Sequence, residues 1–391
     1  MSYHYKEDGK NLQMSKKIII FILLLTTIGF AGFAFINKNK ENVFISPLVE
    51  VIRQYLHESA KEDYHVVGFL PYWNLKNWQM TTKSLDEVIF FSFDADNKGN
   101  LSQNNISPQL LNEKITELRS VLHKNRKKLG FSVTLFNDSD INLLLSNQKS
   151  IDNLIANIQA KINEYQFDSV NIDFEYARDP TGILQENFIK FTQQLRESTK
   201  TSISVDFYSN TLILGDSEAL KQLSNNIDYL IIMAYDFHRP GSFNAGPVAP
   251  LRAENGEKNI LETLQIAFEK FPRQKLILAV PLYGYEWYTQ NEDFASLTLD
   301  KPTAIATYKR VRQLLNENPD VKSFWDRLSL TPWLVYKEGG FIKQIYFENQ
   351  DSIGLKIDLV TQTKIGGIGF WALGYEGEHQ EIWQELARKT N

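Results

Sequence analysis

Short apolar runs that alternate with helical stretches constrain the fold of this chain more than any other feature of its sequence. Eight runs between residues 65 and 371 are rich in Val, Ile, Leu and Phe, which is the pattern of strands buried on both faces. The eight predicted strands cover residues 65–72, 88–94, 128–136, 169–175, 202–208, 229–235, 276–282 and 367–371. Helical periodicity between them is clearest over residues 108–125, 148–165, 184–199 and 260–271.

This alternation indicates an α/β fold in which helices cover a parallel sheet. Eight strands from residue 64 onward fit a (β/α)8 TIM barrel of about 250 residues with insertions. The alternative is an open doubly wound sheet, which needs a glycine-rich phosphate turn after its first strand. The segment FLPYW at residues 69–73 contains no such turn, so we expect the barrel.

The residues beyond those that a barrel of about 250 residues needs lie mostly between the seventh and eighth strands, at about residues 288–347. A helical pattern covers residues 303–316, and a hairpin pattern covers residues 333–337 and 341–347 with Glu338-Gly339-Gly340 at the turn. We expect a small α+β insertion on the barrel rim.

The N-terminal region carries a membrane signal. Residues 1–17 are polar, and residues 18–36 form an uncharged apolar run that is long enough to cross a hydrocarbon core of about 30 Å. We interpret residues 18–36 as an uncleaved transmembrane signal anchor, with a cleaved signal peptide as the alternative. A slight excess of lysine before the run favours a cytoplasmic tail at residues 1–17 and an extracytoplasmic catalytic domain. Residues 37–63 then form a linker with an amphipathic helix at 47–59.

Composition narrows the chemistry. The chain has no cysteine, which excludes disulfides, thiol nucleophiles and cysteine-based metal sites. Its formal net charge of −5 argues against a nucleic-acid partner, because such binders carry a basic footprint. The six histidines are scattered and no H-E-x-x-H motif is present, so we expect neither a catalytic metal nor another cofactor. The oligomeric state is left open.

The most informative segment is the predicted fourth strand, FDSVNIDFEY at residues 167–176. Side chains alternate across a strand, so Asn171, Asp173 and Glu175 share one face and apolar side chains share the other. In a barrel the apolar face meets the helices, and the polar face points to the axis at the strand end where barrel enzymes have their active sites. Asp168 has the opposite parity, and we expect it to brace the start of the strand.

Two carboxyls arranged in this way suit general acid catalysis. Burial and the charge of Asp173 below it disfavour ionisation of Glu175, which helps to keep Glu175 protonated for donation. Cleavage of a glycosidic bond is a reaction that demands such an acid.

The segment D-x-x-N-x-D-x-E resembles the DxxDxDxE signature of glycoside hydrolase family 18, the chitinase-like enzymes. Other motifs resemble that family in the same order along the chain: VGFLPYW at 67–73, MAYD at 233–236, GPVAPL at 246–251, PLYGYEW at 281–287 and GGIGFW at 366–371. The resemblance covers about residues 64–391 and implies a catalytic (β/α)8 barrel.

The activity that the resemblance implies is hydrolysis of β-1,4 bonds next to N-acetylglucosamine, in chitin oligomers, peptidoglycan or N-glycan cores. Glu175 would protonate the leaving oxygen and later activate water, while the acetamido group of the substrate acts as nucleophile and the configuration is retained. Asp173 would stabilise the charge that develops on the acetamido nitrogen. Tyr235 and Asp236 would position the acetamido group, and Trp371 would form an apolar floor under the sugar.

The sequence departs from the family pattern in two places. Position 171 is Asn where the commoner motif has Asp, so Asn171 cannot share a proton with Asp173. We expect Asn171 to bind substrate and to donate a hydrogen bond that keeps Asp173 charged. The third strand, FSVTLFN at 131–137, lacks the SxGG of typical chitinases. Both features resemble the bacterial branch that includes spore-cortex and cell-wall glycosidases.

Three aromatic residues at predicted strand ends, Trp73, Tyr283 and Trp287, are candidates to stack on sugar rings, with packing at the rim as the alternative. A non-catalytic lectin that binds chitin or N-acetylglucosamine on the same fold is the alternative function, although such relatives usually lose the acid at the position of Glu175. A scaffold protein that binds peptides through the insertion would expose a large apolar patch there.

Overall fold

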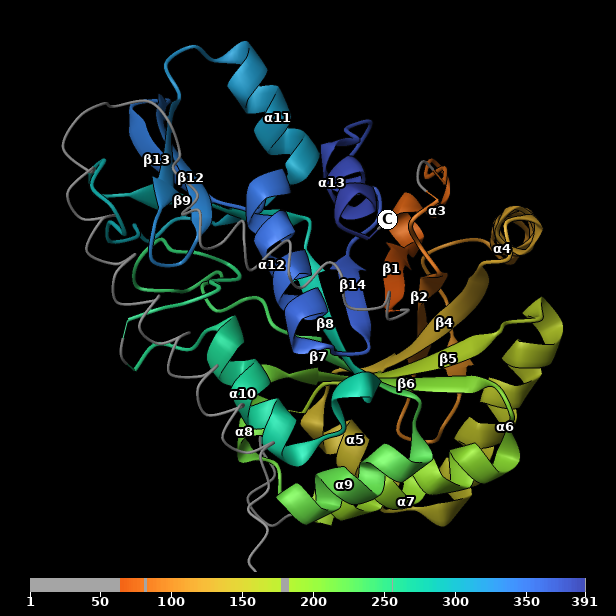
Figure 1. Cartoon of the computed structure of the whole chain (residues 1–391). Coiled ribbons are helices and arrows are strands. Elements are labelled where there is room, and N and C mark those ends of the chain that lie inside the picture. Colours follow the sequence, from red (N-terminus) through yellow and green to blue (C-terminus); the bar gives the residue numbers. More distant parts are fainter. Residues whose placement is uncertain (1–63, 81–82, 177–182, 255, 391) are drawn as a thin grey trace, which may run out of the picture. The chain divides into compact units, whose positions relative to one another are not determined.

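Eight parallel strands close into a barrel in the computed structural model of the chain, which describes residues 64–80, 83–176, 183–254 and 256–390 (Figure 1). The strand order is β1-β14-β8-β7-β6-β5-β4-β2, and β1 pairs with both β14 and β2, so the sheet closes on itself. Closure excludes the open doubly wound sheet, and all eight predicted strands are confirmed. The barrel strands are β1 (His65–Pro71), β2 (Glu87–Ala95), β4 (Lys128–Leu135), β5 (Ser169–Phe174), β6 (Ser202–Tyr208), β7 (Tyr229–Met233), β8 (Leu276–Pro281) and β14 (Gly367–Trp371).

Helices surround the barrel, and the four expected from periodicity are present with ends shifted by a residue at most. Side-chain caps are present on the helices that begin at Pro108, Gln148 and Ile260; for example, the Ser107 side chain accepts from the Leu110 N–H, with proline at the first helical turn. A short strand, β3 (Leu101–Ser102), runs antiparallel to β2. The helices are α3 (Tyr72–Leu75), α4 (Pro108–Lys124), α5 (Asp138–Leu145), α6 (Gln148–Tyr165), α7 (Ile183–Ser198), α8 (Ser209–Leu214), α9 (Ser217–Asn226), α10 (Ile260–Lys270), α12 (Gln350–Thr363) and α13 (Glu381–Thr390), with a 3-10 turn at Arg273–Lys275.

The predicted cytoplasmic tail, the transmembrane helix at 18–36 and the amphipathic helix at 47–59 lie outside the described residues. Within the stretches that the structure describes, no helix combines the length and the apolarity needed to cross a membrane. The described residues belong to one compact unit.

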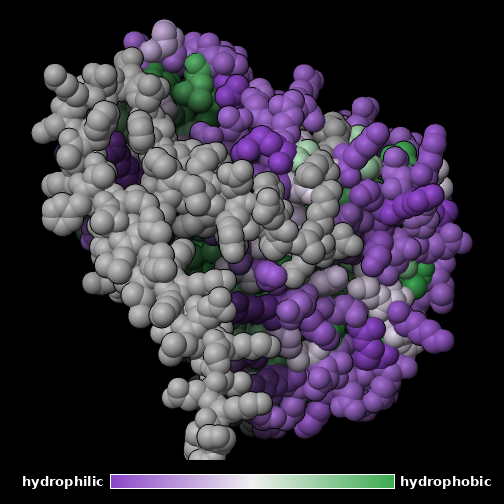
Figure 2. Space-filling model, in the orientation of Figure 1, coloured by the Kyte–Doolittle hydropathy of each residue, from purple (hydrophilic) through white to green (hydrophobic). Residues whose placement is uncertain are grey.

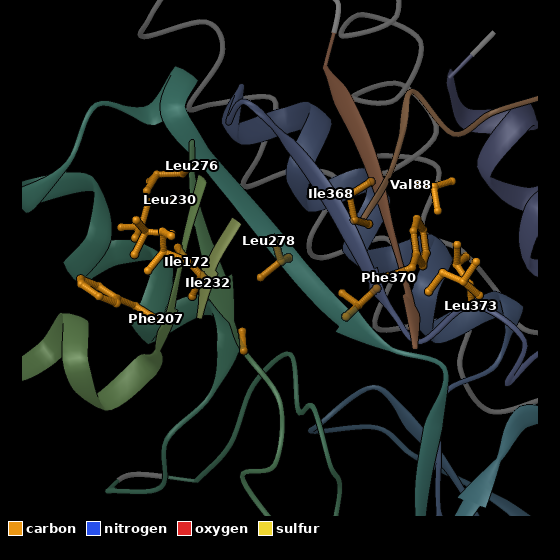
Figure 3. Packing of buried hydrophobic residues seen from close by; sticks show 14 of the residues in the cluster. Val88, Ile172, Phe207, Leu230, Ile232, Leu276, Leu278, Ile368, Phe370 and Leu373 are labelled. Atoms are coloured by element: carbon orange, nitrogen blue, oxygen red, sulfur yellow. The ribbon is translucent and has the colours of Figure 1, made fainter. Parts of the chain in front are cut away.

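The main hydrophobic core lies between the barrel and its helices. The outward face of β5 is buried as the alternation predicts, and the ring of Phe174 stacks on Phe191 of α7 with centroids 5.9 Å apart. At the start of β5, the Asp168 carboxylate accepts from the Leu129 N–H at 2.8 Å, so it braces the strand as expected. Figure 3 shows the same outward-facing layer on other strands, with Phe207, Leu230, Ile232, Leu278, Ile368 and Phe370 among the buried residues.

The interior of the barrel is divided into an apolar part and a polar part. Strands β1, β2, β7 and β8 contribute an apolar cluster, made of Val67, Phe69, Ile89, Ile231, Ile277 and Ala279. Strands β4, β5 and β6 instead contribute buried polar side chains, which are Ser132, Thr134, Asn171, Asp173, Ser204 and Asp206. Burying polar groups is costly unless they are hydrogen-bonded, so the polar part is the candidate location for the catalytic groups.

The insertion is larger than the sequence predicts. It is a five-stranded antiparallel sheet of order β10-β9-β13-β12-β11 with one helix and a core of its own. The predicted hairpin and helix are confirmed, but the sheet begins at Tyr283, before the expected boundary at residue 288. Its elements are β9 (Tyr283–Thr289), β10 (Ala304–Thr307), α11 (Tyr308–Glu317), β11 (Lys322–Asp326), β12 (Thr331–Glu338) and β13 (Phe341–Tyr346).

The scaffold alternative requires a continuous apolar patch on this insertion. Ile305 is exposed on β10, whereas Phe324 and Trp325 are exposed on β11, and these two strands form opposite edges of the sheet. On the face drawn in Figure 2, hydrophilic residues cover most of the described surface and apolar residues form small separate patches. On the insertion, the exposed rings of Phe294 and Phe324 both contact Trp333, with centroids 5.8 Å and 4.5 Å apart, and this local group is the feature on which the scaffold alternative would depend.

Candidate active site

A cavity of about 260 Å³ opens at the carboxyl end of the barrel strands. Four carboxyl groups meet there, from β5 and the residue that follows it, from β6 and from the segment after β7, facing a set of aromatic rings. Among the described residues, its lining includes no lysine, arginine or histidine. The carboxyls belong to Asp173, Glu175, Asp206 and Asp236, and the rings to Phe69, Phe91, Phe136, Tyr208, Tyr235, Tyr283 and Trp371.

Glu175 follows the last residue of β5, and its backbone N–H donates to the carbonyl of Leu135 at 3.0 Å, which continues the pairing with β4. Its Oε2 atom accepts a hydrogen bond from the Tyr208 hydroxyl at 2.9 Å. Burial raises the pKa of the Glu175 carboxyl; the Tyr208 hydrogen bond opposes this, and the charge of Asp236 adds to it. The direction is the one a general acid requires, as the sequence predicts.

Asp173 lies one layer deeper on the same face of β5 and is only 3% exposed. Its Oδ1 atom is buried and has no hydrogen-bond partner among the described atoms. Burial raises the pKa of this carboxyl well above its usual range, and the charges of Asp206 and Glu175 raise it further.

Asn171 does not reach the cavity, which corrects its predicted role. It is fully buried beneath the site, where its Oδ1 accepts from Ser132 at 2.6 Å. Its amide donates to Asp206 at 2.7 Å and to Ser204 at 3.1 Å. The predicted hydrogen bond to Asp173 is therefore wrong, because the neighbouring strand β6 supplies acceptors that the sequence of β5 does not reveal.

Tyr235 and Asp236, from the MAYD motif after β7, both line the cavity as predicted. Asp236 has a positive φ of 59°, an uncommon conformation for a residue other than glycine. Its Oδ1 accepts from the hydroxyls of Tyr283 at 2.5 Å and Tyr285 at 2.9 Å. Burial raises the pKa of Asp236, and these two hydrogen bonds oppose the rise.

The predicted aromatic residues separate into three cases. Trp371 lines the cavity, and its ring contacts Phe91 edge-on at 4.6 Å, so its orientation is held by packing. Trp73 lies in α3, outside the lining; it is 45% exposed and 6.4 Å from the Trp371 ring. Trp287 is only 1% exposed and packs against Tyr346 of the insertion. Its predicted stacking on sugar is wrong, because Trp287 lies on β9 of the inserted sheet and its side chain is buried in the main hydrophobic core.

Two residues of β6 were missed in the sequence, namely Asp206 and Tyr208, which both line the cavity. The signal was available: in SISVDFY, polar residues alternate with apolar ones as they do in β5. Among the described residues, no group of acidic or histidine side chains is arranged to hold a metal ion.

A barrel with a buried acid at its carboxyl end, facing tyrosines and a tryptophan, suits the cleavage of glycosidic bonds. The model of the family described as glycosyl hydrolases family 18 matches residues 65–376. This chain belongs to that family.

The curated relatives include glycosidases of spore-forming bacteria. The putative sporulation-specific glycosylase YdhD of Bacillus subtilis is 25% identical over 258 residues, which cover 62% of this chain and 54% of that protein. The cortical fragment-lytic enzyme of the same species is 22% identical over 297 residues, which cover 73% of this chain and 63% of that protein. The chain thus spans between about half and two thirds of the length of these relatives.

Solved structures show the same fold. A GH18 chitinase from Cycas revoluta in complex with (GlcNAc)3 superimposes with a TM-score of 0.73 at 15% identity, over 84% of this chain and 100% of that one. The spore cortex-lytic enzyme SleL of Bacillus megaterium superimposes with a TM-score of 0.65 at 20% identity, over 85% of this chain and 75% of that one.

Proposed function

We propose that this chain is a glycosidase that cleaves β-1,4 bonds next to N-acetylglucosamine, in chitin oligomers or peptidoglycan, with Glu175 as acid and base. The observation that carries the proposal is the Glu175 carboxyl, which opens into the cavity with a raised pKa while the buried Asp173 lies on the same face of β5. A carboxyl that stays protonated beside a second, deeper carboxyl suits a reaction that first gives a proton to a leaving oxygen.

The first step breaks the glycosidic bond. Glu175 gives its proton to the leaving oxygen while the carbonyl oxygen of the substrate's own acetamido group attacks the anomeric carbon. The resulting oxazolinium ring carries positive charge, and the carboxylate of Asp173 accepts a hydrogen bond from its N–H. Tyr235 and Asp236 hold the acetamido group, and Trp371 supports the sugar ring.

The second step returns the enzyme to its starting state. Glu175, now ionised, takes a proton from a water molecule that attacks the same anomeric carbon. The oxazolinium ring opens to regenerate the acetamido group, and two inversions leave the configuration retained. No second protein nucleophile is needed, which agrees with the depth at which Asp173 lies.

Two arguments bear on the substrate and on the non-catalytic alternative. One relative is named a cortical fragment-lytic enzyme, and a solved structure is a GH18 chitinase in complex with (GlcNAc)3, so we take both peptidoglycan and chitin as candidate substrates. The lectin alternative has no support from these relatives, which are named as enzymes, and the acid that such lectins usually lose is present as Glu175.

The test measures hydrolysis of chitotetraose and of purified peptidoglycan by the full chain. Activity on either polymer, abolished in Glu175→Gln and kept in Glu113→Gln on the exposed face of α4, supports the proposal. Proton NMR of the first product should give the β anomer, and a fully deacetylated oligomer should resist cleavage, because it lacks the nucleophile. Binding without hydrolysis of either polymer overturns the proposal in favour of the lectin.

We also propose that residues 18–36 anchor the chain in a membrane, with the catalytic barrel on the extracytoplasmic side. The support is the uncharged apolar run and the lysines that precede it. Polymers of the cell envelope lie on that side of the membrane, which agrees with the proposed substrates.

A further inference from the structure

Strand β6 carries a carboxyl at the same level of the barrel as Asp173. The pairing of β5 with β6 sets Asn171 opposite Ser204 and Ile172 opposite Val205. One step further along both strands come Asp173 and Asp206, which are 3% and 4% exposed and both line the cavity. Two aspartates on neighbouring strands thus face the barrel axis side by side.

The hydrogen bonds beneath this pair leave Asp173 without a donor. The amide of Asn171 gives its two hydrogens to Asp206 and Ser204, and its carbonyl oxygen is taken by Ser132. Asn171 therefore has no further amide hydrogen to donate to Asp173. The Oδ1 atom of Asp173 is buried without a partner among the described atoms. A buried acceptor without a donor is costly, and a protonated carboxyl on β6 within reach of Oδ1 would remove that cost.

The electrostatics favour a retained proton on the pair. Burial raises the pKa of Asp206 well above its usual range; the Asn171 hydrogen bond opposes this, and the charge of Glu175 adds to it. Carboxyls packed together at low dielectric cannot all ionise, so they titrate as a coupled group. The other titratable groups around the pair are Glu175, Tyr208, Tyr235 and Asp236.

We propose that Asp206 is the positioning residue for Asp173: its carboxyl holds a proton that it donates to Oδ1 of Asp173. The carboxyl that the motif strand lacks at Asn171 is thus supplied from β6. While the substrate is neutral, the proton lies between the two carboxyls. When positive charge develops in the substrate, the proton moves onto Asp206 and leaves Asp173 as the carboxylate. The catalytic consequence rests on the proposed function, whereas the shared proton does not.

Substitution by asparagine separates this role from a structural one. In Asp206→Asn the new carbonyl oxygen still accepts from Asn171, so the buried network is kept, but the titratable proton is lost. The double variant Asn171→Asp/Asp206→Asn moves the carboxyl back to β5, beside Asp173 on the same strand face. Asp320→Asn, at an exposed loop of the insertion, controls for the loss of one charge.

The kinetic test uses the full chain and the polymer that the wild type hydrolyses. We expect Asp206→Asn to lower kcat about 100-fold with KM changed less than about threefold, since the loss falls in the transition state. The double variant should have a kcat at least about tenfold higher than that of Asp206→Asn. The kcat of Asp320→Asn should match that of the wild type. If Asp206→Asn keeps the wild-type kcat, or if the double variant recovers nothing, the proposal is wrong.

A second test needs no activity. Thermal unfolding at pH 7 of the wild type, Asp173→Asn, Asp206→Asn and the double Asp173→Asn/Asp206→Asn forms a double-mutant cycle. A shared proton makes the two shifts in Tm non-additive, whereas additive shifts overturn the proposal. If the wild type hydrolyses no N-acetylated polymer, the proposed function fails and this cycle still decides the question of Asp206.

Discussion

The Tyr208 hydroxyl donates a hydrogen bond to Oε2 of Glu175 at 2.9 Å, joining the end of β6 to the acid at the end of β5. This bond stabilises the ionised form of Glu175 and so opposes burial, which raises the pKa of the same carboxyl. The pKa of Glu175 therefore depends on two opposing effects: burial raises it, and the hydrogen bond from Tyr208 on the neighbouring strand lowers it.

Removing this hydroxyl should change the pH dependence of hydrolysis. In Tyr208→Phe the pKa of Glu175 should rise further, because the hydrogen bond that lowers this pKa is lost. The reaction needs protonated Glu175, so the alkaline limb of kcat/KM should move to higher pH, with a rate loss of about tenfold from poorer positioning. The measurement is a pH profile between pH 4 and 9 on one oligosaccharide.

The insertion offers a matched control for this change. Tyr336 donates a hydrogen bond to the Glu286 carboxylate at 2.5 Å. This is also a bond from tyrosine to glutamate, but neither residue lines the cavity. Tyr336→Phe should leave both limbs of the profile in place. An alkaline limb that stays unchanged in Tyr208→Phe would show that Tyr208 does not control the pKa of Glu175.

Substitution of Asp173 should separate turnover from binding. In Asp173→Asn the carboxylate that stabilises the transition state is lost while the shape of the site is kept. We expect kcat to fall at least about 100-fold, with oligosaccharide affinity within about threefold of the wild type. Isothermal titration and steady-state kinetics measure the two quantities, and undiminished turnover would refute the assigned role.

Relative to the wild type, Asp173→Asn should become more stable as the pH rises. The pKa of Asp173 is higher in the folded state than its ordinary value of about 3.9. The folded state therefore binds this proton more tightly, and its contribution to stability is present below pH 4 and is lost as the pH rises through the folded pKa. The difference in Tm between Asp173→Asn and the wild type should grow between pH 5 and pH 8. A difference that is constant over this range would contradict the raised pKa.

Much of the barrel could be predicted because each strand is apolar on its outward face. The same alternation correctly assigned Asp173 and Glu175 to the inner face of β5. Asp206 and Tyr208 follow the same rule on β6, but the motif was sought on a single strand, so the partnership between neighbouring strands was missed. Which strand supplies the acceptor for Asn171 depends on register, and register is a property of the closed sheet.

The start of the insertion could not be predicted from local pattern. Strand β8 ends at Pro281 and β9 begins at Tyr283, so one continuous apolar and aromatic run belongs to two different sheets. The chain turns at Leu282, whose N–H donates to the carbonyl of Trp371 at 2.6 Å, a contact between distant segments. The burial of Trp287 likewise depends on distant segments, since its ring packs against Tyr346 of β13.

The proposed anchor predicts how the full chain fractionates. An apolar run of the length of residues 18–36 should keep the protein in the membrane fraction after a wash in high salt and release it in detergent. A variant that lacks residues 1–36 should appear in the supernatant. A mature N-terminus near residue 35 in the wild type, found by N-terminal sequencing, would instead establish a cleaved signal peptide.

A buried ion pair joins the insertion to the barrel helices. Lys356 of α12 and Glu348, which follows β13, are both fully buried and lie 2.6 Å apart. Burial raises the pKa of Glu348 above its usual range, and the charge and hydrogen bond of Lys356 oppose part of this rise. The pair lies outside the lining of the cavity, so we interpret it as a structural contact.

Breaking this pair should therefore cost stability without changing the chemistry. Lys356→Met leaves the Glu348 carboxyl buried and uncompensated, which should lower the free energy of unfolding by about 3–5 kcal/mol. In the double variant Lys356→Met/Glu348→Leu both charges are gone, and most of that loss should be recovered, because an apolar pair of similar volume has no desolvation penalty. Urea unfolding measures both changes, and kcat on the chosen oligosaccharide should stay at the wild-type value at temperatures where the variants are folded. A double variant as unstable as the single one would mean that the ion pair itself, rather than the unpaired charge, determines the stability of this joint.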